Sequence, residues 1–378
     1  MNLAAATALV VLAAGLGPAV SPALAEVIPV DSLAGLRQAL AEARPGDEIR
    51  LGPGRYRGRL HLDCTPNGAP GRPIRICGAA GPARSVIDGG GATIVVKFSA
   101  VGFIELCDLE ITGGAYHGIF FDRGAHDIRI QGNRVHDNTL ARPLIGNAEI
   151  KGSALRPEDA TRRIQIVGNE IFHGEHPAGV NFQGIDCNLC LDYVVRGNLL
   201  HDIRPSATDD GRAKSPSFHD RGSCIQIKGG SAGTVVEGNL IQDCAYGIVF
   251  GGEFRTPPSH AGGRVVANVV VGSRGAGMVS LSAVGAEIVG NLILGSAVSL
   301  IVKPDSRAPD FAGAIRFLGN GHDGGLRISG PTRVTLQGNC RVAWSGRRPP
   351  GRGLGDLAAR LAAYRAAVEP QDCAWPKR

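Results

Sequence analysis

The phrase apolar-x-Gly-Asn recurs along this chain. Copies end at the asparagines Asn133, Asn169, Asn198, Asn239, Asn291 and Asn339, and Val266-Ala-Asn268 is a degenerate copy. The asparagines at positions 133, 169, 198, 239, 268 and 291 are separated by 36, 29, 41, 29 and 23 residues. These intervals indicate a coil of about 22–25 residues with loops of different sizes inserted, which is typical of a solenoid.

Glycine and asparagine suit a corner of such a coil. Glycine adopts positive φ without steric cost, and asparagine tolerates the left-handed region and can hydrogen-bond to the next coil. We therefore interpret these asparagines as structural. Roughly ten residues after each one, apolar and variable residues alternate as in a strand with one buried face. Aligning these strands predicts two inward stacks: Ile119, Ala148, Val180, Ile225 and Ile248, and Phe121, Ile150, Phe182, Ile227 and Phe250.

Both ends of the coil carry helical patterns that could cover its open core. Leu33, Leu36 and Leu40 fall on one helical face after Asp31-Ser32, a good N-cap, and Leu357, Leu361, Tyr364 and Val368 repeat the pattern near the end. The fold class predicted is all-β, a single-stranded right-handed parallel β-helix (solenoid) with an N-terminal capping helix and a C-terminal helical segment. The predicted divisions are a signal peptide at 1–25, the β-helix with its N-terminal cap at 26–345, and a C-terminal capping helix and tail at 346–378.

Composition and charge restrict the partners. Of the 378 residues 43% are hydrophobic and 20% charged, which supports a buried core and excludes a disordered chain. The net charge is +6, with arginine far more frequent than lysine, and guanidinium groups pair well with carboxylates or sulfates. The basic residues form no compact block with interleaved aromatics, so nucleic acid is not an expected partner.

The first residues predict export. Residues 3–20 are apolar, and Ala23-Leu24-Ala25 is the small-x-small pattern that precedes signal-peptide cleavage. No later apolar run is long enough to span a membrane. We expect a secreted or periplasmic monomer. Nine cysteines then permit disulfides and leave one thiol unpaired. Cys64 with Cys77 is the preferred pair, and zinc at Cys187-x-x-Cys190 is disfavoured because no second ligand pair has matching spacing.

The opening segment resembles a known superfamily. Residues 33–56 (LAGLRQALAEARPGDEIRLGPGRY), Gly71-Arg-Pro-Ile-Arg-Ile76 and Val86-Ile-Asp-Gly89 are similar to the entry of right-handed parallel β-helix proteins of the pectate-lyase-like superfamily. With the Gly-Asn coils, the resemblance covers about residues 27–340. It implies a polysaccharide groove on one outer face, walled here by the insertions 139–146, 155–162 and 203–222. Activity stays open, because this architecture serves lyases, hydrolases, epimerases and adhesive proteins.

The predicted strand alignment places polar residues in rows on that outer face. Asp122, Lys151, Gln183 and Lys228 would occupy one position, with Glu149, Asn181 and Gln226 two residues earlier. The phrases Glu149-Ile-Lys151-Gly-Ser and Gln226-Ile-Lys228-Gly-Gly-Ser are similar to a region of the alginate-lyase and chondroitinase-B group. That resemblance implies a lysine base, an assisting arginine and a calcium ion. The residues assigned to these roles are Lys228, Lys151 and Arg221 for catalysis, Asp122, Arg123, Gln183, Gln226, Arg212 and His219 for substrate, and Glu149, Asn181 and Asp186 for Ca²⁺.

The chemistry demands a cation, because removing the proton α to a uronate carboxylate creates a second negative charge. A lysine base needs a lowered pKa, and we expect Lys151 and Lys228 to lower the pKa of each other. The sequence departs from the group, since the acid-to-lysine spacing differs and Gln226 stands where an acid is expected. The favoured function is a lyase that cleaves an acidic polysaccharide by β-elimination. Whether the chain is an enzyme at all stays open at this point.

Other activities on this fold have weaker support in the sequence. The Asp-Pro-His-Asp motif of mannuronan epimerases is absent, and Tyr116-His117-Gly118 only partly matches the Gly-His-Gly phrase of polygalacturonase-like hydrolases, although Asp209-Asp210 supplies paired acids. The alternatives are a non-catalytic glycan-binding or cell-surface β-helix, or a hydrolase or epimerase. Histidines 136, 173 and 201 follow the Gly-Asn corners and are expected to stack in a structural role.

Overall fold

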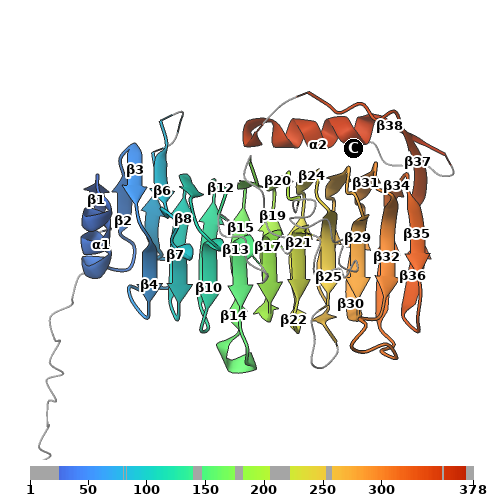
Figure 1. Ribbon diagram of the computed structural model, residues 1–378, viewed down its shortest axis with the longest axis horizontal. Coiled ribbons are helices and arrows are strands. Elements are labelled where there is room, and N and C mark those ends of the chain that lie inside the picture. Colours follow the sequence, from blue (N-terminus) through green and yellow to red (C-terminus); the bar gives the residue numbers. More distant parts are fainter. Residues whose placement is uncertain are drawn as a thin grey trace, which may run out of the picture.

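A computed structural model describes residues 25–79, 81, 83–138, 147–174, 182–204, 222–252, 258–350 and 353–371. Three long sheets, which we name A, B and C, run side by side along the molecule (Figure 1). The chain passes from a strand of sheet C to sheet A, then to sheet B, and returns to sheet C one coil further on. All neighbouring strands within the described residues pair in parallel except the last pair of sheet B. The molecule is a parallel β-helix, as predicted.

The strands have the following bounds. Sheet A contains β1 (Val27–Val30), β2 (Glu48–Leu51), β5 (Ile74–Cys77), β8 (Gly102–Cys107), β11 (His126–Gln131), β14 (Thr161–Arg162), β15 (Gln165–Val167), β18 (Cys190–Leu191), β19 (Val194–Arg196), β22 (Ser231–Ala232), β23 (Val235–Glu237), β26 (His260–Ala261), β27 (Arg264–Val266), β30 (Ala283–Val289), β33 (Ala314–Leu318) and β36 (Arg333–Gln337). Sheet B contains β3 (Gly54–Arg57), β6 (Ser85–Asp88), β9 (Leu109–Thr112), β12 (Arg134–His136), β16 (Glu170–Phe172), β20 (Leu199–His201), β24 (Leu240–Gln242), β28 (Val269–Val271), β31 (Leu292–Leu294), β34 (Gly321–His322), β37 (Cys340–Trp344) and β38 (Val368–Pro370). Sheet C contains β4 (Leu60–Asp63), β7 (Ile94–Ser99), β10 (His117–Asp122), β13 (Asn147–Ser153), β17 (Phe182–Asn188), β21 (Ser223–Lys228), β25 (Tyr246–Gly251), β29 (Ala276–Leu281), β32 (Val298–Lys303) and β35 (Gly325–Ile328).

The Gly-Asn phrases form the corner between sheets A and B. Gly168 has a φ of +61°, and the degenerate copy places Ala267 at +57°. Each later asparagine of the series accepts from the backbone N–H of the asparagine one coil earlier, as in the 2.9 Å bond from Asn169 N–H to Asn198 Oδ1, whereas the first, Asn133, accepts from Leu109 N–H. The side-chain amide of each later asparagine donates to a carbonyl of that earlier coil, as Asn198 does to Ile166. The structural role predicted for these residues is confirmed.

One member of this corner escaped the sequence analysis. Asn320 follows Gly319 and continues the series, because Asn291 N–H donates to its Oδ1 at 2.9 Å and Asn320 N–H donates to Asn339 at 3.0 Å. The phrase Phe317-Leu318-Gly319-Asn320 fits the repeat and was a readable signal.

The two helices treat the ends of the coil differently. In α1 (Leu33–Glu42), Ser32 Oγ accepts from Gly35 N–H at 3.1 Å, and Leu36 and Leu40 close the core at the first coil. By contrast, α2 (Leu357–Ala366) lies along the outer face of sheet B over the later coils, rather than across the end (Figure 1). No helix among the described residues is long and apolar enough to cross a membrane.

The predicted disulfide is wrong. Cys77 pairs with Cys107 on the neighbouring strand of sheet A, where the strand register makes the two cysteines direct partners, and Cys64 is an exposed free thiol. Cys187 and Cys190 bond to each other, which removes them as metal ligands, and the third disulfide within the described residues joins Cys224 to Cys244. Cys340 is disulfide-bonded as well. Pairing across coils cannot be read from spacing along the chain, which explains the error.

Candidate active site

Polar and aromatic side chains occupy one position on successive strands of sheet C. The strand register pairs Lys97 with Phe120, Phe120 with Lys151, Lys151 with Asp186 and Asp186 with Gln226. We call these five residues the sheet C row. They alternate with the inward residues of the same strands, such as Ile150 and Ile185, so they lie on the outer face. Adjacent members are therefore about 4.8 Å apart along the molecule.

The centre of the row is an ionic group. The carboxylate of Asp186 is fully buried and contacts the ammonium groups of Lys151, at 2.5 Å, and of Lys228, at 3.1 Å. Lys228 is also buried, whereas 14% of the Lys151 side chain is exposed. Two lysines thus share one carboxylate, and Lys151 is the member of the group nearest to solvent.

The two lysines contact a shared carboxylate, whereas the sequence had predicted that they would act directly on each other. The ammonium groups of Lys151 and Lys228 meet through the carboxylate of Asp186, so the nearest partner of each lysine is an anion. Asp186 was predicted as a calcium ligand, and the structure assigns it to the lysines instead. Breaking such a buried pair leaves an uncompensated charge, which makes Asp186 a residue that holds both lysines in place.

Gln226 continues the row beside Asp186. The residue is 1% exposed, and neither its amide oxygen nor its amide nitrogen has a hydrogen-bond partner in the described part of the chain. An amide buried in this way costs free energy unless another group completes its hydrogen bonds. A ligand hydroxyl could accept from the Gln226 amide nitrogen or donate to its oxygen, and a ligand carboxylate could accept from the nitrogen.

His117 and Phe120 belong to the same site, although the sequence analysis did not assign them. Their rings stack at 5.2 Å, and His117 Nδ1 accepts from the Ala148 N–H at 3.2 Å, which leaves the proton on Nε2. Burial, and then the nearby Lys151 ammonium, lowers the pKa of His117 to about 3. His117 is therefore neutral near pH 7 and offers an N–H donor. The sequence feature that could have identified His117 was the Tyr116-His117-Gly118 phrase. Only the pairing of β10 with β13 shows that this phrase lies near Lys151.

Two predicted substrate residues have intramolecular partners. Asp122 lies on β10, the strand next to β13, and pairs with Lys97 of the sheet C row at 2.8 Å. Arg123 lies on the exposed turn after β10, where its φ is +50°, and pairs with Asp63 at 3.0 Å.

The predicted alignment of the rows is wrong in register. Lys151 pairs with Asp186, whereas Gln183 pairs with Ala148, and Lys228 pairs with Asn188. The core residue Phe182 pairs with Asn147 rather than with Ile150, whose partner is Ile185, and Val180 lies outside the described residues. Glycines interrupt the apolar alternation in β13 and β17, so several registers fit the sequence equally well. The buried Gln183 nevertheless lies on the same strand as Asp186.

The described residues do not fit a calcium ion. Glu149 is fully buried, and its carboxylate accepts from the Asn138 side chain at 2.6 Å and lies 3.6 Å from His173 Nδ1. By register Glu149 lies opposite Gly184, two residues before Asp186. The carboxylate oxygens of Asp186 contact the ammonium groups of Lys151 and Lys228. Within the described ranges, no group of three or more His, Cys, Asp or Glu side chains could hold a metal. Oxygen donors that already serve amide and ammonium groups do not form the open anionic cage that Ca²⁺ requires.

The corner histidines stack in part as expected. His136 and His201 lie on either side of Phe172 on sheet B, with ring centroids 4.6 and 4.9 Å from it. Burial opposes protonation of His136, but the carboxylates of Asp137 and Glu110 outweigh it and raise its pKa to about 9. His173 does not join this stack, because it lies beside Glu149 and Asp137.

Four assigned residues, Asn181, Arg212, His219 and Arg221, lie outside the described residues. The segments 139–146, 175–181 and 205–221 each join a strand of sheet B to one of sheet C, the corner that precedes β13, β17 and β21. The insertion at 155–162 instead follows β13, on the way to sheet A, and includes a 3₁₀ turn at Pro157–Asp159.

The fold defines the molecule as a parallel β-helix protein, an architecture that it shares with known carbohydrate-active enzymes. An alginate lyase from Paenibacillus sp. str. FPU-7 matches with a TM-score of 0.56 and 18% identity, over 82% of this chain and 99% of the lyase. Pectate lyase Pel9A matches with a TM-score of 0.52 and 12% identity, over 83% and 78%. A GH136 lacto-N-biosidase from Eubacterium ramulus reaches a TM-score of 0.49 at 12% identity, over 82% and 68%. No family model and no curated protein sequence matches the chain.

Proposed function

We propose that this protein is an exported polysaccharide lyase that cleaves an acidic, uronate-containing polysaccharide by β-elimination. The observation that carries the proposal is the group of Lys151, Asp186 and Lys228 on the outer face of sheet C. Lysine side chains placed on such a face are suited to a carboxylate-bearing sugar. The shared fold with an alginate lyase and a pectate lyase supports the same reading.

In this proposal Lys151 is the base and acts in the amine form, after losing its proton to solvent, because it is the more exposed lysine of the group, while Lys228 keeps the ammonium charge opposite Asp186. It takes the proton from the carbon α to the uronate carboxylate, and the electron pair left behind forms the new double bond. The glycosidic oxygen on the neighbouring carbon leaves and receives a proton from the ammonium group so formed. Asp186 and the buried Lys228 position Lys151, and Gln226 hydrogen-bonds to the sugar.

The developing charge on the uronate needs a further cation. Arg221 remains our candidate, because it precedes β21, the strand that carries Gln226 and Lys228, by two residues. Arg212 and His219 in the same segment are candidates for substrate contacts. We derive no step through Ca²⁺.

Export is part of the proposal. The apolar segment at 3–20 with its Ala23-Leu24-Ala25 site supports a cleaved signal peptide. The disulfides Cys77–Cys107, Cys187–Cys190 and Cys224–Cys244 are typical of proteins that fold in an oxidising compartment.

The test is incubation of the purified protein with alginate, pectate and glycosaminoglycans, with and without Ca²⁺, while the ultraviolet absorbance of the unsaturated product is followed. We expect activity on at least one substrate, and a loss of about 100-fold or more in kcat for Lys151→Met. Lys303→Met, which changes a lysine further along sheet C, is the matched control and should retain activity. Full activity of Lys151→Met would overturn the assignment of the base.

The second candidate is a glycan-binding β-helix without catalysis, and a specific observation favours it. Asp186 and Lys228 are so deeply buried that their ion pairs could serve the fold alone. Saturable binding of an acidic oligosaccharide with no cleavage of any substrate would establish this alternative. New reducing ends without an unsaturated product would instead indicate a hydrolase.

A further inference from the structure

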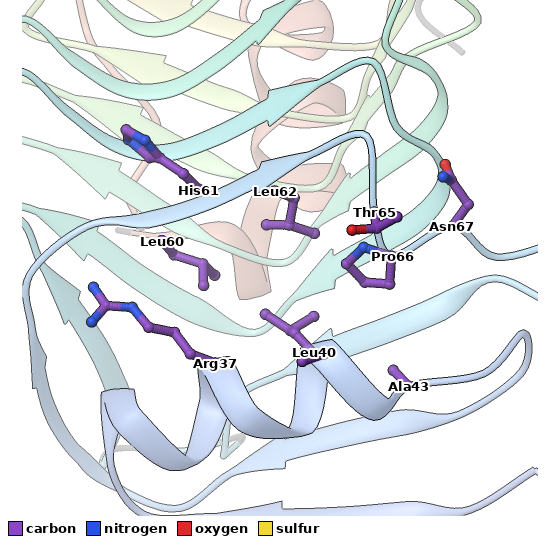
Figure 2. Close-up of a pocket in the computed structure, with 10 residues that line it drawn as sticks. Arg37, Leu40, Ala43, Leu60, His61, Leu62, Thr65, Pro66 and Asn67 are labelled. Atoms are coloured by element: carbon purple, nitrogen blue, oxygen red, sulfur yellow. The ribbon is translucent and has the colours of Figure 1, made fainter.

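A pocket lies at the N-terminal end of sheet C. This pocket, of about 440 Å³, separates the later half of α1 from β4 and the loop after it (Figure 2). Figure 2 shows Arg37 and His61 toward one end of the pocket and Leu40, Leu60 and Leu62 in its middle. The volume is in the range of small-ligand pockets, which combine an apolar lining with a few polar groups.

The rim of this pocket is positively charged. Arg37 donates to the carbonyl oxygen of Arg59 at 2.7 Å, and both side chains are exposed. Neither arginine has a carboxylate partner among the described residues. Lys97, on the next strand, adds a third cation near the pocket and forms an ion pair with Asp122. Burial lowers the pKa of His61, and the charges of Arg59, Lys97 and Arg37 lower it further, against a hydrogen bond to the Ile94 carbonyl that raises it. By strand register His61 lies beside Lys97. An anion bound there would relieve the repulsion among these cations.

The pocket is aligned with the candidate active site. His61 pairs by register with Lys97, the first member of the sheet C row, and the row continues through Phe120 to Lys151. Three strand steps separate His61 from Lys151, a distance of about 14 Å. A polysaccharide lying along the outer face of sheet C at Lys151 would therefore reach the pocket within a few sugar units.

We propose that the pocket lined by Arg37 and His61, with Arg59 beside Arg37, is an anchoring subsite for an acidic sugar unit of the same polysaccharide that is cleaved at Lys151. The inference rests on the proposed function for its substrate. The guanidinium groups would bind the carboxylate of the sugar. Leu40, Leu60 and Leu62 belong to the core, so the accessible lining residues Ala41, Ala43 and Pro66 would contact the C–H groups of its ring. The subsite would hold the chain without touching the bond that breaks.

The test compares the double variant Arg37→Met/Arg59→Met with Arg327→Met. Arg327 is an exposed residue of β35, at the opposite end of sheet C, where it pairs by register with Ile301 of β32, which makes it a matched control. We expect the double variant to raise KM about tenfold for oligouronates long enough to span from Lys151 to the pocket, with kcat unchanged. Oligouronates too short to span should show no change in KM, and Arg327→Met should behave as wild type.

Direct binding separates this inference from the proposed function. Calorimetric titration with a long oligouronate and with a neutral oligosaccharide of equal length needs no cleavage. If no substrate is cleaved but the double variant binds the oligouronate about tenfold more weakly, the pocket is supported and the lyase assignment fails. If cleavage occurs while the KM and the affinity of the double variant equal those of wild type, the pocket inference is overturned. Equal binding of the neutral oligosaccharide by wild type would also overturn it.

Discussion

Asp186 is the residue that organises the candidate active site. Its fully buried carboxylate contacts Lys151 and Lys228, which come from strands on either side of β17. Neither lysine could be buried to this extent without a counter-charge, because removing one partner of a buried pair leaves the other without solvation. The residue therefore links the stability of the three strands to the positions of both lysines.

We predict that Asp186→Asn lowers the free energy of unfolding by about 3 kcal/mol, because it removes a buried carboxylate that both ammonium groups contact. Urea unfolding would measure the change. Asp122→Asn removes the partner of Lys97 in a partly exposed pair, where 26% and 20% of the two side chains are accessible, and should cost less than about 1 kcal/mol. Equal costs for the two variants would contradict the assigned role of Asp186.

His136 makes stability depend on pH in the alkaline range. Its pKa is about 9 in the folded protein, against about 6.5 for an unfolded chain. The stabilising contribution is complete below pH 6.5 and is lost as the pH rises through 9, because only the folded state keeps the proton in that window. His136→Phe preserves a ring against Phe172 but cannot titrate. We expect wild type to lose up to about 3 kcal/mol more than this variant between pH 6 and 9.5 in urea unfolding. Parallel pH profiles would argue against a protonated His136.

At the residue scale the sequence predicted the types of group better than their partners. Lys151, Lys228, Asp186 and Gln226 were all assigned to the site, and the structure brings them together. Their roles depended on register, and a shift of two or three residues exchanges one neighbour for another. Arg123 shows a second limit, since a positive φ at a turn decides where its side chain goes.

The asparagine corner is the element that made the fold predictable. The corner needs a residue that tolerates positive φ followed by a side chain that hydrogen-bonds to the neighbouring coil. The phrase Gly-Asn therefore recurs in the sequence. The strands are different, because many apolar residues satisfy an inward position and glycines at 118, 152 and 184 break the alternation. The corner therefore indicates that coils exist, while the register between strands is set by packing that no single motif records.

Loss of one corner amide should destabilise the middle of the coil more than its end. Asn198→Ala removes the acceptor for Asn169 and the donor to Ile166, all of them buried, and we expect a cost of about 3 kcal/mol. Asn339→Ala makes a similar change at the half-exposed last corner, where water can replace the lost bonds, and should cost about 1 kcal/mol. Thermal unfolding would rank the two, and an equal or reversed ranking would count against the corner as the main determinant.

At the scale of the whole molecule, α2 covers an apolar strip that would otherwise face solvent. Leu357 and Tyr364 pack on Leu240, Val269 and Leu292 of successive coils, and Gln242 donates to the Tyr364 hydroxyl at 2.7 Å. Sequence patterning predicted this helix from its apolar spacing. Its place on sheet B could not be predicted, since the apolar outer face of β24, β28 and β31 reads like any buried strand.

Removing the contact should loosen only the later coils. We expect Tyr364→Ala to cost about 3 kcal/mol, because it leaves a cavity over sheet B, and Tyr364→Phe to cost about 1 kcal/mol through the lost hydrogen bond. Hydrogen exchange should accelerate at β24, β28 and β31 in Tyr364→Ala and stay unchanged at β7 and β10, because coils interact with their neighbours alone. Uniform acceleration along the chain would contradict this division.

The amide corner also separates the length of a coil from its alignment. Successive asparagines from Asn133 to Asn339 bond to one another across gaps that range from 19 to 41 residues. Every circuit of the backbone thus resumes at a common starting point, however much chain it has spent at the other two corners. New segments inserted between sheets B and C should therefore change which ligand the protein binds, while the strand register of the β-helix stays the same.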